Sequence, residues 1–136
     1  MYARTYAQIL GAVLILVGLV GLALGNQVWG GILNVDIAED IVHLITGGIL
    51  AYVGFGRTEF SVTRNVVGLL GIIYLMVGVL GFASPTMFGL IPHGYTAFDN
   101  LLHLVLGGLS VAVAWWFFGA ERGVRTQNQA ERDGEL

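Results

Sequence analysis

Residues 37–55 of the chain read IAEDIVHLITGGILAYVGF, an apolar stretch that opens with two acids and carries His43 shortly before a pair of glycines. Crossing a hydrocarbon core about 30 Å thick as a helix takes about 20 predominantly apolar residues. Similar stretches cover residues 6–24, 66–83 and 98–120. In lipid, stretches of this length satisfy their backbone polar groups as helices. The sequence therefore predicts an all-α membrane protein, a bundle of four transmembrane helices.

The composition of the chain agrees with a membrane protein. Of its 136 residues, 56% are hydrophobic and only 11% are charged, which is too apolar for a water-soluble domain of this size. Cysteine is absent, so disulfides and thiolate metal ligands are excluded. The formal net charge of −3 and the lack of a basic patch argue against nucleic acid as a partner. We expect a single transmembrane domain over residues 1–120 in the lipid bilayer, and a flexible polar cytoplasmic tail over 121–136.

The strongest pattern in the sequence is an internal repeat. A shift of 60 residues moves His43 onto His103 and needs no gap. The same shift superimposes a set of glycines, Gly11, Gly18, Gly21, Gly47 and Gly48 onto Gly71, Gly78, Gly81, Gly107 and Gly108. Repeat one covers about residues 6–56 and repeat two about 66–118. Because each repeat holds two spans, we expect two tandem parallel helical hairpins, related by an axis along the membrane normal.

Positive charges predict the orientation in the membrane. All six basic side chains are arginines, and all lie on one side of the predicted spans: Arg4, Arg57, Arg64, Arg122, Arg125 and Arg132. The two loops on the other side, residues 25–36 and 84–97, contain none. The positive-inside rule then predicts that both termini are cytoplasmic. We expect a multi-pass protein of the inner (cytoplasmic) cell membrane of a bacterium or archaeon.

Glycines mark the expected packing faces of the helices. Small residues let helices approach closely, which van der Waals packing in lipid requires. The predicted helix-packing residues are Gly18, Gly21, Gly47, Gly48, Gly78, Gly81, Gly107 and Gly108. Such faces can serve packing within the bundle, or contact with a second copy or another membrane subunit.

Both even-numbered spans begin with a polar cluster. Asp36 with Glu39, and Thr96 with Asp99, have the spacing of helix capping boxes. Each histidine follows its cap by seven residues, about 10 Å deeper in a helix, near the outer boundary of the membrane. The predicted polar or ligand site consists of Glu39, Asp40, His43, Asp99, Asn100 and His103.

Three interpretations of this site remain open from the sequence. The histidines can act as polar contacts between the repeats. They can instead ligate one haem iron or one transition metal, with Glu39 or Asp40 as an added ligand or as its support. A third possibility is a proton or ion pathway, although no deeper ionisable group is visible along the spans. A ferritin-like di-iron site is disfavoured, because the first and third spans carry no carboxylate.

The sequence favours a non-catalytic role. Its serines and threonines show no arrangement of nucleophile, base and orienting group, and no phosphate-binding or zinc-protease motif occurs. We expect a structural or accessory membrane subunit, acting as a homo-oligomer or within a larger complex, that is not an enzyme and binds no cofactor. The proline-containing loop over residues 84–97 is expected to cover the histidine end of the bundle.

Two segments resemble a known family. DIVHLITGG at residues 40–48 and FDNLLHLVLGG at residues 98–108 are similar to the signature segments of a bacterial and archaeal membrane family known as domain of unknown function 4383. Each half of that family carries an Asn-x-x-His-Leu-x-x-Gly pattern. The second copy matches it from Asn100 through His103, and the first has Asp40 in place of the asparagine. The resemblance, over about residues 6–118, implies four membrane helices and no particular activity.

Overall fold

The computed structural model describes residues 2–29 and 32–116. Within these ranges, four helices are long and apolar enough to cross a membrane. They are α1 (Tyr2–Leu24), α2 (Ile37–Phe55), α3 (Phe60–Ala83) and α4 (Ala97–Val111), which runs on into a π-helical segment, η2 (Ala112–Trp116). The predicted bundle of four helices, each long and apolar enough to cross a membrane, is confirmed. The end of the expected fourth span, residues 117–120, and the expected tail, residues 121–136, lie outside the described residues.

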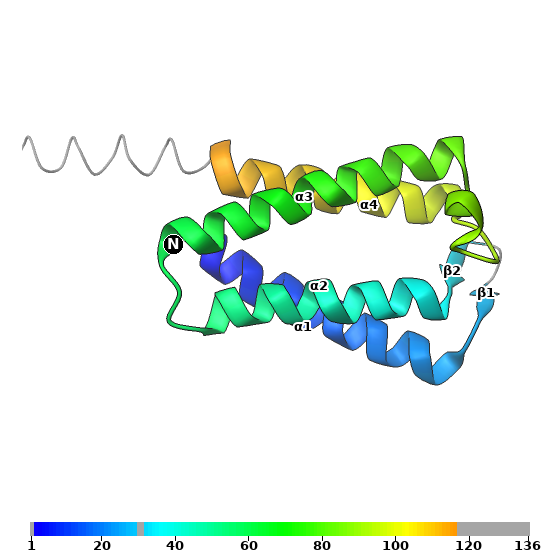
Figure 1. Ribbon diagram of the computed structural model, residues 1–136, viewed down its shortest axis with the longest axis horizontal. Coiled ribbons are helices and arrows are strands. Elements are labelled where there is room, and N and C mark those ends of the chain that lie inside the picture. The colour runs from blue at the N-terminus through cyan, green and yellow to red at the C-terminus, as the bar shows by residue number, and fades with distance from the viewer. Residues whose placement is uncertain (1, 30–31, 117–136) are drawn as a thin grey trace, which may run out of the picture.

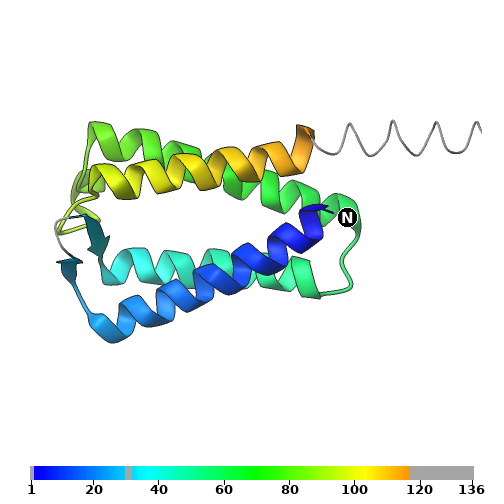
Figure 2. The same cartoon turned by 180° about the vertical axis from the view of Figure 1, so that it is seen from behind.

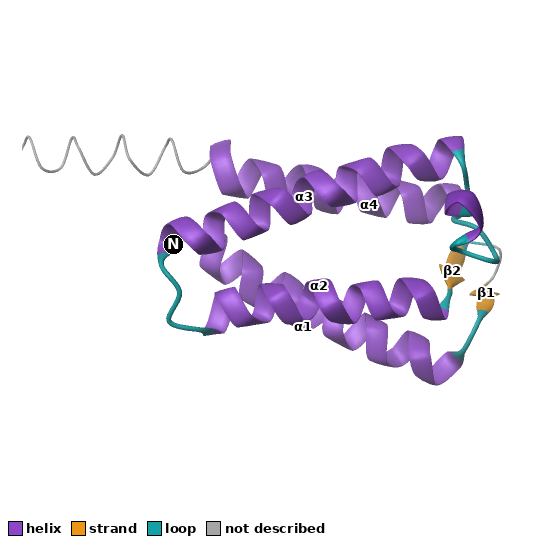
Figure 3. Cartoon of the chain, in the orientation of Figure 1, coloured by secondary structure: helices purple, strands orange, loops and turns teal. Residues whose placement is uncertain are grey.

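The helices pair as two antiparallel hairpins, α1 with α2 and α3 with α4 (Figure 1). The start of α1 and the α2–α3 connection lie at one end of the bundle, and the connections within each hairpin lie at the other end (Figure 3). Seen from behind, α1 and α4 face the viewer (Figure 2). We call the end with the connections within the hairpins the hairpin-loop end.

Glycines allow the close approach of the helices within each hairpin. A Cβ atom on Gly47 would lie 2.9 Å from the backbone nitrogen of Ile15, and one on Gly107 would lie 2.7 Å from that of Leu75. The same crowding occurs at Gly18 and Gly78, where a Cβ would meet a leucine side chain and a backbone carbonyl of the paired helix. The hairpins therefore owe their tight packing to residues without side chains.

Gly48 and Gly108 behave differently from the other predicted packing residues. A Cβ atom on either would meet nothing within 4 Å. Gly48 directly follows Gly47, and Gly108 directly follows Gly107, but a Cβ on Gly48 or Gly108 would point away from the paired helix. Within the described chain, these two glycines do not form part of a helix-packing face.

The hairpin-loop end contains a small β-hairpin that the sequence did not predict. Strands β1 (Gln27–Trp29) and β2 (Leu33–Val35) pair antiparallel, with Gln27 opposite Val35. Gly25 ends α1 in a left-handed conformation, φ 73°, which suits a glycine after a helix C-terminus. The backbone N–H of Asn34 donates to Asp99 Oδ2 at 3.0 Å, and the Thr96 hydroxyl donates to the Ile32 carbonyl. This β-hairpin thus ties the first helical hairpin to the start of α4.

Of the two predicted capping boxes, one is fully formed in the structure and the other is formed in part. The capping box of Thr96 and Asp99 is confirmed, since each side chain bonds the backbone of the other residue. Asp36 does cap α2, accepting from the Ala38 N–H at 3.1 Å. However, the predicted reciprocal bond from Glu39 is wrong, because the Glu39 carboxylate turns inward toward the two histidines.

Candidate metal centre

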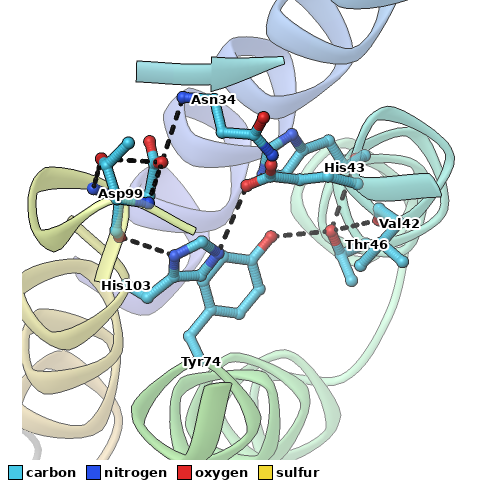
Figure 4. Close-up of polar contacts among 9 residues, drawn as sticks. Asn34, Val42, His43, Thr46, Tyr74, Asp99 and His103 are labelled. Carbon is cyan, nitrogen blue, oxygen red and sulfur yellow. Dashed lines mark hydrogen bonds and ion pairs between the residues drawn. The ribbon is translucent and has the colours of Figure 1, made fainter. Parts of the chain in front are cut away.

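Three of the predicted site residues converge between the two helical hairpins. His43 comes from α2 and His103 from α4 (Figure 4). Glu39 also lies on α2, one turn before His43. The imidazole rings of the two histidines lie 6.4 Å apart between centroids, with an interplanar angle of 17°. One oxygen of Glu39 and one nitrogen of each histidine lie within 4.8 Å of one another. Two imidazoles and one carboxylate form a ligand set for divalent transition metals.

Hydrogen bonding orients the His103 ring for ligation. Its Nδ1–H donates to the Asp99 carbonyl at 2.7 Å, since a carbonyl oxygen can only accept. In the neutral ring Nε2 then carries the lone pair, and it faces Glu39 Oε1 at 3.8 Å. A histidine that ligates a metal through one nitrogen typically donates the other N–H to a carbonyl or carboxylate.

The spacing of the three side chains leaves room for an ion among them. His43 Nε2 lies 3.9 Å from Glu39 Oε1, so neither histidine is close enough to this oxygen for a hydrogen bond. Two ligands each about 2.1 Å from one ion can lie up to about 4.2 Å apart. Both distances between histidine nitrogen and carboxylate oxygen fall within that limit.

Several polar atoms around the three residues are buried without a hydrogen-bond partner among the described residues. They include Glu39 Oε2, His43 Nδ1 and both amide atoms of Asn34. The Asn34 amide interacts with the Glu39 carboxylate, but not with hydrogen-bond geometry. An unsatisfied buried polar group costs about 1–3 kcal/mol. The described protein groups alone therefore leave several polar atoms of the cluster without a hydrogen-bond partner.

Asp99 supports the cluster from the start of α4. Its Oδ2 accepts from the backbone N–H groups of Thr96, at 2.9 Å, and of Asn34, at 3.0 Å, and lies 2.9 Å from the Thr96 hydroxyl. With these hydrogen bonds made, Asp99 holds the turn whose carbonyl orients His103. It is a positioning residue and does not point into the group of three ligands.

Asp40 and Asn100 occupy matching places in the two hairpins, apart from the ligand atoms. Asp40 lies against the backbone of Gly21, and Asn100 lies against that of Gly81, so a Cβ on either glycine would overlap the polar side chain. Both side chains are at least 97% buried. Both were predicted as members of the polar or ligand site, but their side chains fill the notches of the paired helices instead.

Sequence reasoning missed a tyrosine and a threonine just below the cluster. Tyr74 lies with its ring centroid 5.4 Å from that of His103, and its hydroxyl is 3.0 Å from that of Thr46. A second hydroxyl pair, Tyr6 with Ser110 at 2.9 Å, joins α1 to α4. The internal repeat contained a signal for Tyr74. After the shift of 60 residues this tyrosine aligns with the aliphatic Leu14, so it is a position at which the two repeats differ in polarity.

The loop over residues 84–96 covers the cluster, as expected. The Tyr95 ring packs edge-on against His103, 5.1 Å between centroids and at an angle of 62°. Burial, together with the nearby carboxylates of Glu39 and Asp99, raises the pKa of Tyr95 above its usual value. His93 lies with Nδ1 3.5 Å from Asp36 Oδ2, which joins the loop to the cap of α2. His93 is outside the group of three ligands.

A bare metal ion fits the cluster better than a haem does. A haem ligated by His43 and His103 would place its porphyrin plane between the two imidazoles. Oε1 of the buried Glu39 lies within 3.9 Å of Nε2 of each histidine, so its carboxylate stands in the way of that plane. As a third ligand to a small ion, the same carboxylate would instead complete the set.

The fold and the cluster together define a bundle of four helices that are long and apolar enough to cross a membrane, with a buried group of two histidines and one glutamate. Comparison of the chain with protein-family models, with curated proteins and with solved structures found no match.

Proposed function

We propose that the protein binds a divalent transition metal ion through Glu39, His43 and His103, near the outer face of the membrane. The observation that carries this proposal is the His103 Nε2 lone pair facing the Glu39 carboxylate at 3.8 Å. A neutral imidazole nitrogen and a carboxylate oxygen are both acceptors, and a cation between them would satisfy both in this buried site. A hydrogen bond is ruled out as the link by its length.

The chemistry of the three ligands indicates the class of ion. Nitrogen and oxygen ligands without sulfur suit zinc, iron, cobalt and manganese. Zinc is bound by two histidines and a glutamate in several proteins, where the fourth position stays open for water or another ligand. We assign no reaction to the site, and the expectation that the protein is not an enzyme stays part of the proposal.

Metal binding can be measured on protein purified in detergent with a tag that contains no histidines. After loading with Zn²⁺ and removal of the free ion, elemental analysis is expected to give about one ion per chain. Loading with Co²⁺ is expected to give a visible spectrum typical of four or five nitrogen and oxygen ligands. His43→Ala, His103→Ala and Glu39→Gln should each weaken binding, since each removes one ligand.

His93→Ala is the matched control, because His93 is a nearby histidine outside the ligand group. It should retain the ion. The proposal fails if wild-type protein binds no more Zn²⁺ than the His43→Ala variant, or if His93→Ala loses as much as His103→Ala. A Soret band in the purified protein would instead establish the haem alternative.

The topology in the membrane is part of the proposal. The six arginines support cytoplasmic termini, and this places the cluster toward the outer face. The matching notches, Asp40 on Gly21 and Asn100 on Gly81, support a tandem repeat of one hairpin. A relation to the family known as domain of unknown function 4383 is also part of the proposal, and the two histidine segments, residues 40–48 and 98–108, support it.

A second candidate is the role expected from the sequence, an accessory subunit or homo-oligomer without a cofactor. The observation that favours it is the open space beside Gly48 and Gly108, which would admit a helix of another chain. In that case the purified protein is colourless and free of metal. Its Gly48→Leu variant should then change the oligomeric state, whereas a purely metal-binding monomer should be unaffected.

A further inference from the structure

A cavity of about 530 Å³ begins at the cluster and runs between α1 and α4. Its volume lies in the range of pockets that enclose small ligands. The polar end is formed by the three proposed ligands together with Asn34, Asp40, Tyr74 and Asp99. Apolar side chains form the rest of the lining, among them Leu16, Val17 and Val20 of α1 and Leu102 and Leu106 of α4.

The apolar part of the cavity reaches the outer surface of the bundle in the described part of the chain. Leu16 is 62% exposed and Val17 is 43% exposed, although both line the cavity. They lie in the middle of α1, one of the helices long enough to span the membrane. At that depth the surroundings are hydrocarbon rather than water. A ligand can therefore enter sideways, from the bilayer.

The polar end of the cavity lacks hydrogen-bond partners. Glu39 is 6% exposed and Asn34 is 4% exposed, yet Glu39 Oε2 and both amide atoms of Asn34 remain unpaired. Asn34 offers a donor and an acceptor, and Glu39 offers an acceptor. A head group with hydroxyl or carbonyl oxygens could satisfy both residues. Its oxygen could also take the open position of a metal held by the cluster.

Charge restricts the head group further. Asp36, Asp40 and Asp99 are all close enough to Glu39 to interact with it electrostatically. Together with Glu39 they make four carboxyl groups, which is more than the two positive charges of a divalent ion can balance. A ligand with a carboxylate or phosphate head group would therefore be repelled at short range. An uncharged head group would not be repelled in this way.

We propose that this cavity binds an uncharged, single-chain amphiphile whose head carries hydroxyl or carbonyl oxygens, with its chain extending between α1 and α4 into the bilayer. The proposal rests on the proposed metal site only for the contact between head group and ion. The cavity and its unpaired polar atoms stand independently of the metal.

Binding can be tested with radiolabelled 1-dodecanol and the full-length protein in phosphatidylcholine nanodiscs. The anionic probe dodecanoate has the same chain length and serves as the control for the head group. Wild-type protein should bind 1-dodecanol saturably. Val17→Trp, which fills the mouth of the cavity, should weaken that binding by about tenfold or more. Leu69→Trp, on an exposed face of α3 that does not line the cavity, should not.

Three results would overturn the inference: no saturable binding of 1-dodecanol, equal binding by the two tryptophan variants, or binding of dodecanoate as tight as that of the alcohol. Zinc content measured on the same samples separates the two proposals. Normal zinc without alcohol binding rejects the cavity ligand alone. Alcohol binding without zinc rejects the metal site alone. A folded Val17→Trp protein should keep its zinc, because Val17 is not among the ligands.

Discussion

Two adjacent glycines of α2 should respond in opposite ways to the same substitution. A Cβ on Gly47 would lie 2.9 Å from the Ile15 nitrogen and 3.0 Å from the Gly11 carbonyl oxygen. These are backbone atoms, which cannot rotate away, so the helices of the first hairpin would have to separate. A Cβ on Gly48 would meet nothing within 4 Å.

The sizes of the two effects follow from these contacts. Overpacking of a tight interface typically costs about 1–3 kcal/mol, which we expect for Gly47→Ala. Replacing a helical glycine with alanine at an open position stabilises by about 0.5–1 kcal/mol, which we expect for Gly48→Ala. Gly107→Ala and Gly108→Ala should repeat the contrast in the second hairpin, because a Cβ on Gly107 would lie 2.7 Å from the Gly71 oxygen.

The stabilities can be compared by titrating each variant from mild detergent into sodium dodecyl sulfate. Near-ultraviolet circular dichroism follows the loss of aromatic packing, and the midpoints give the order of stability. Equal midpoints for Gly47→Ala and Gly48→Ala would refute the argument, because the two variants differ only in which side of α2 receives the methyl group. A destabilised Gly48→Ala would point to a contact with another chain at that face.

Two further predictions concern hydrogen bonds near the site. A double-mutant cycle of Thr46→Val and Tyr74→Phe should give a coupling energy of about 0.6 kcal/mol, and at most about 1.7 kcal/mol. These are the values found for hydrogen bonds between membrane helices. If the effects of the two substitutions are additive, the 3.0 Å contact between the hydroxyls contributes nothing to stability. Asp99→Ala should lower the unfolding free energy by about 1–3 kcal/mol, since its Oδ2 accepts from two backbone N–H donors. Glu59→Ala, at a helix N-cap whose side chain makes no capping bond, is the control and should stay within about 0.5 kcal/mol of wild type.

The fold was predictable because its main determinants are local. Apolar length fixes where a chain can cross a bilayer, and the expected second span, residues 37–55, has the same bounds as α2. The start of α3 was placed six residues too late, since Phe60 begins the helix. Its first turns carry polar residues, among them Thr63 and Arg64, which hydropathy alone assigns to a loop.

The β-hairpin was missed for a different reason. Its strands are three residues each, too short for an alternating pattern to stand out. What stabilises β2 is its contact with α4 through Asn34 and Asp99, and a contact between residues 65 positions apart leaves no mark in the local sequence.

All three proposed metal ligands were among the residues that the sequence predicted for the polar site. The separate roles of the six predicted residues were not predictable. Spacing brought His43 and His103 to the same depth, and Glu39 to the turn before His43. Which acid faces inward depends on how the hairpins are rotated against each other, and this follows from the glycine notches. Asp40 and Asn100 are drawn into those notches, which leaves Glu39 to face the histidines.

The difference between the two proposed repeats explains why the cluster contains a single carboxylate. Glu39 and Asp99 occupy matching positions after a shift of 60 residues. The shorter Asp99 closes a capping box with Thr96, whereas Glu39 has one more methylene group and leaves its cap to Asp36. In the absence of an ion, a second inward carboxylate would add a buried negative charge, which is costly. The two neutral histidines and one glutamate balance one of the two charges of a divalent ion.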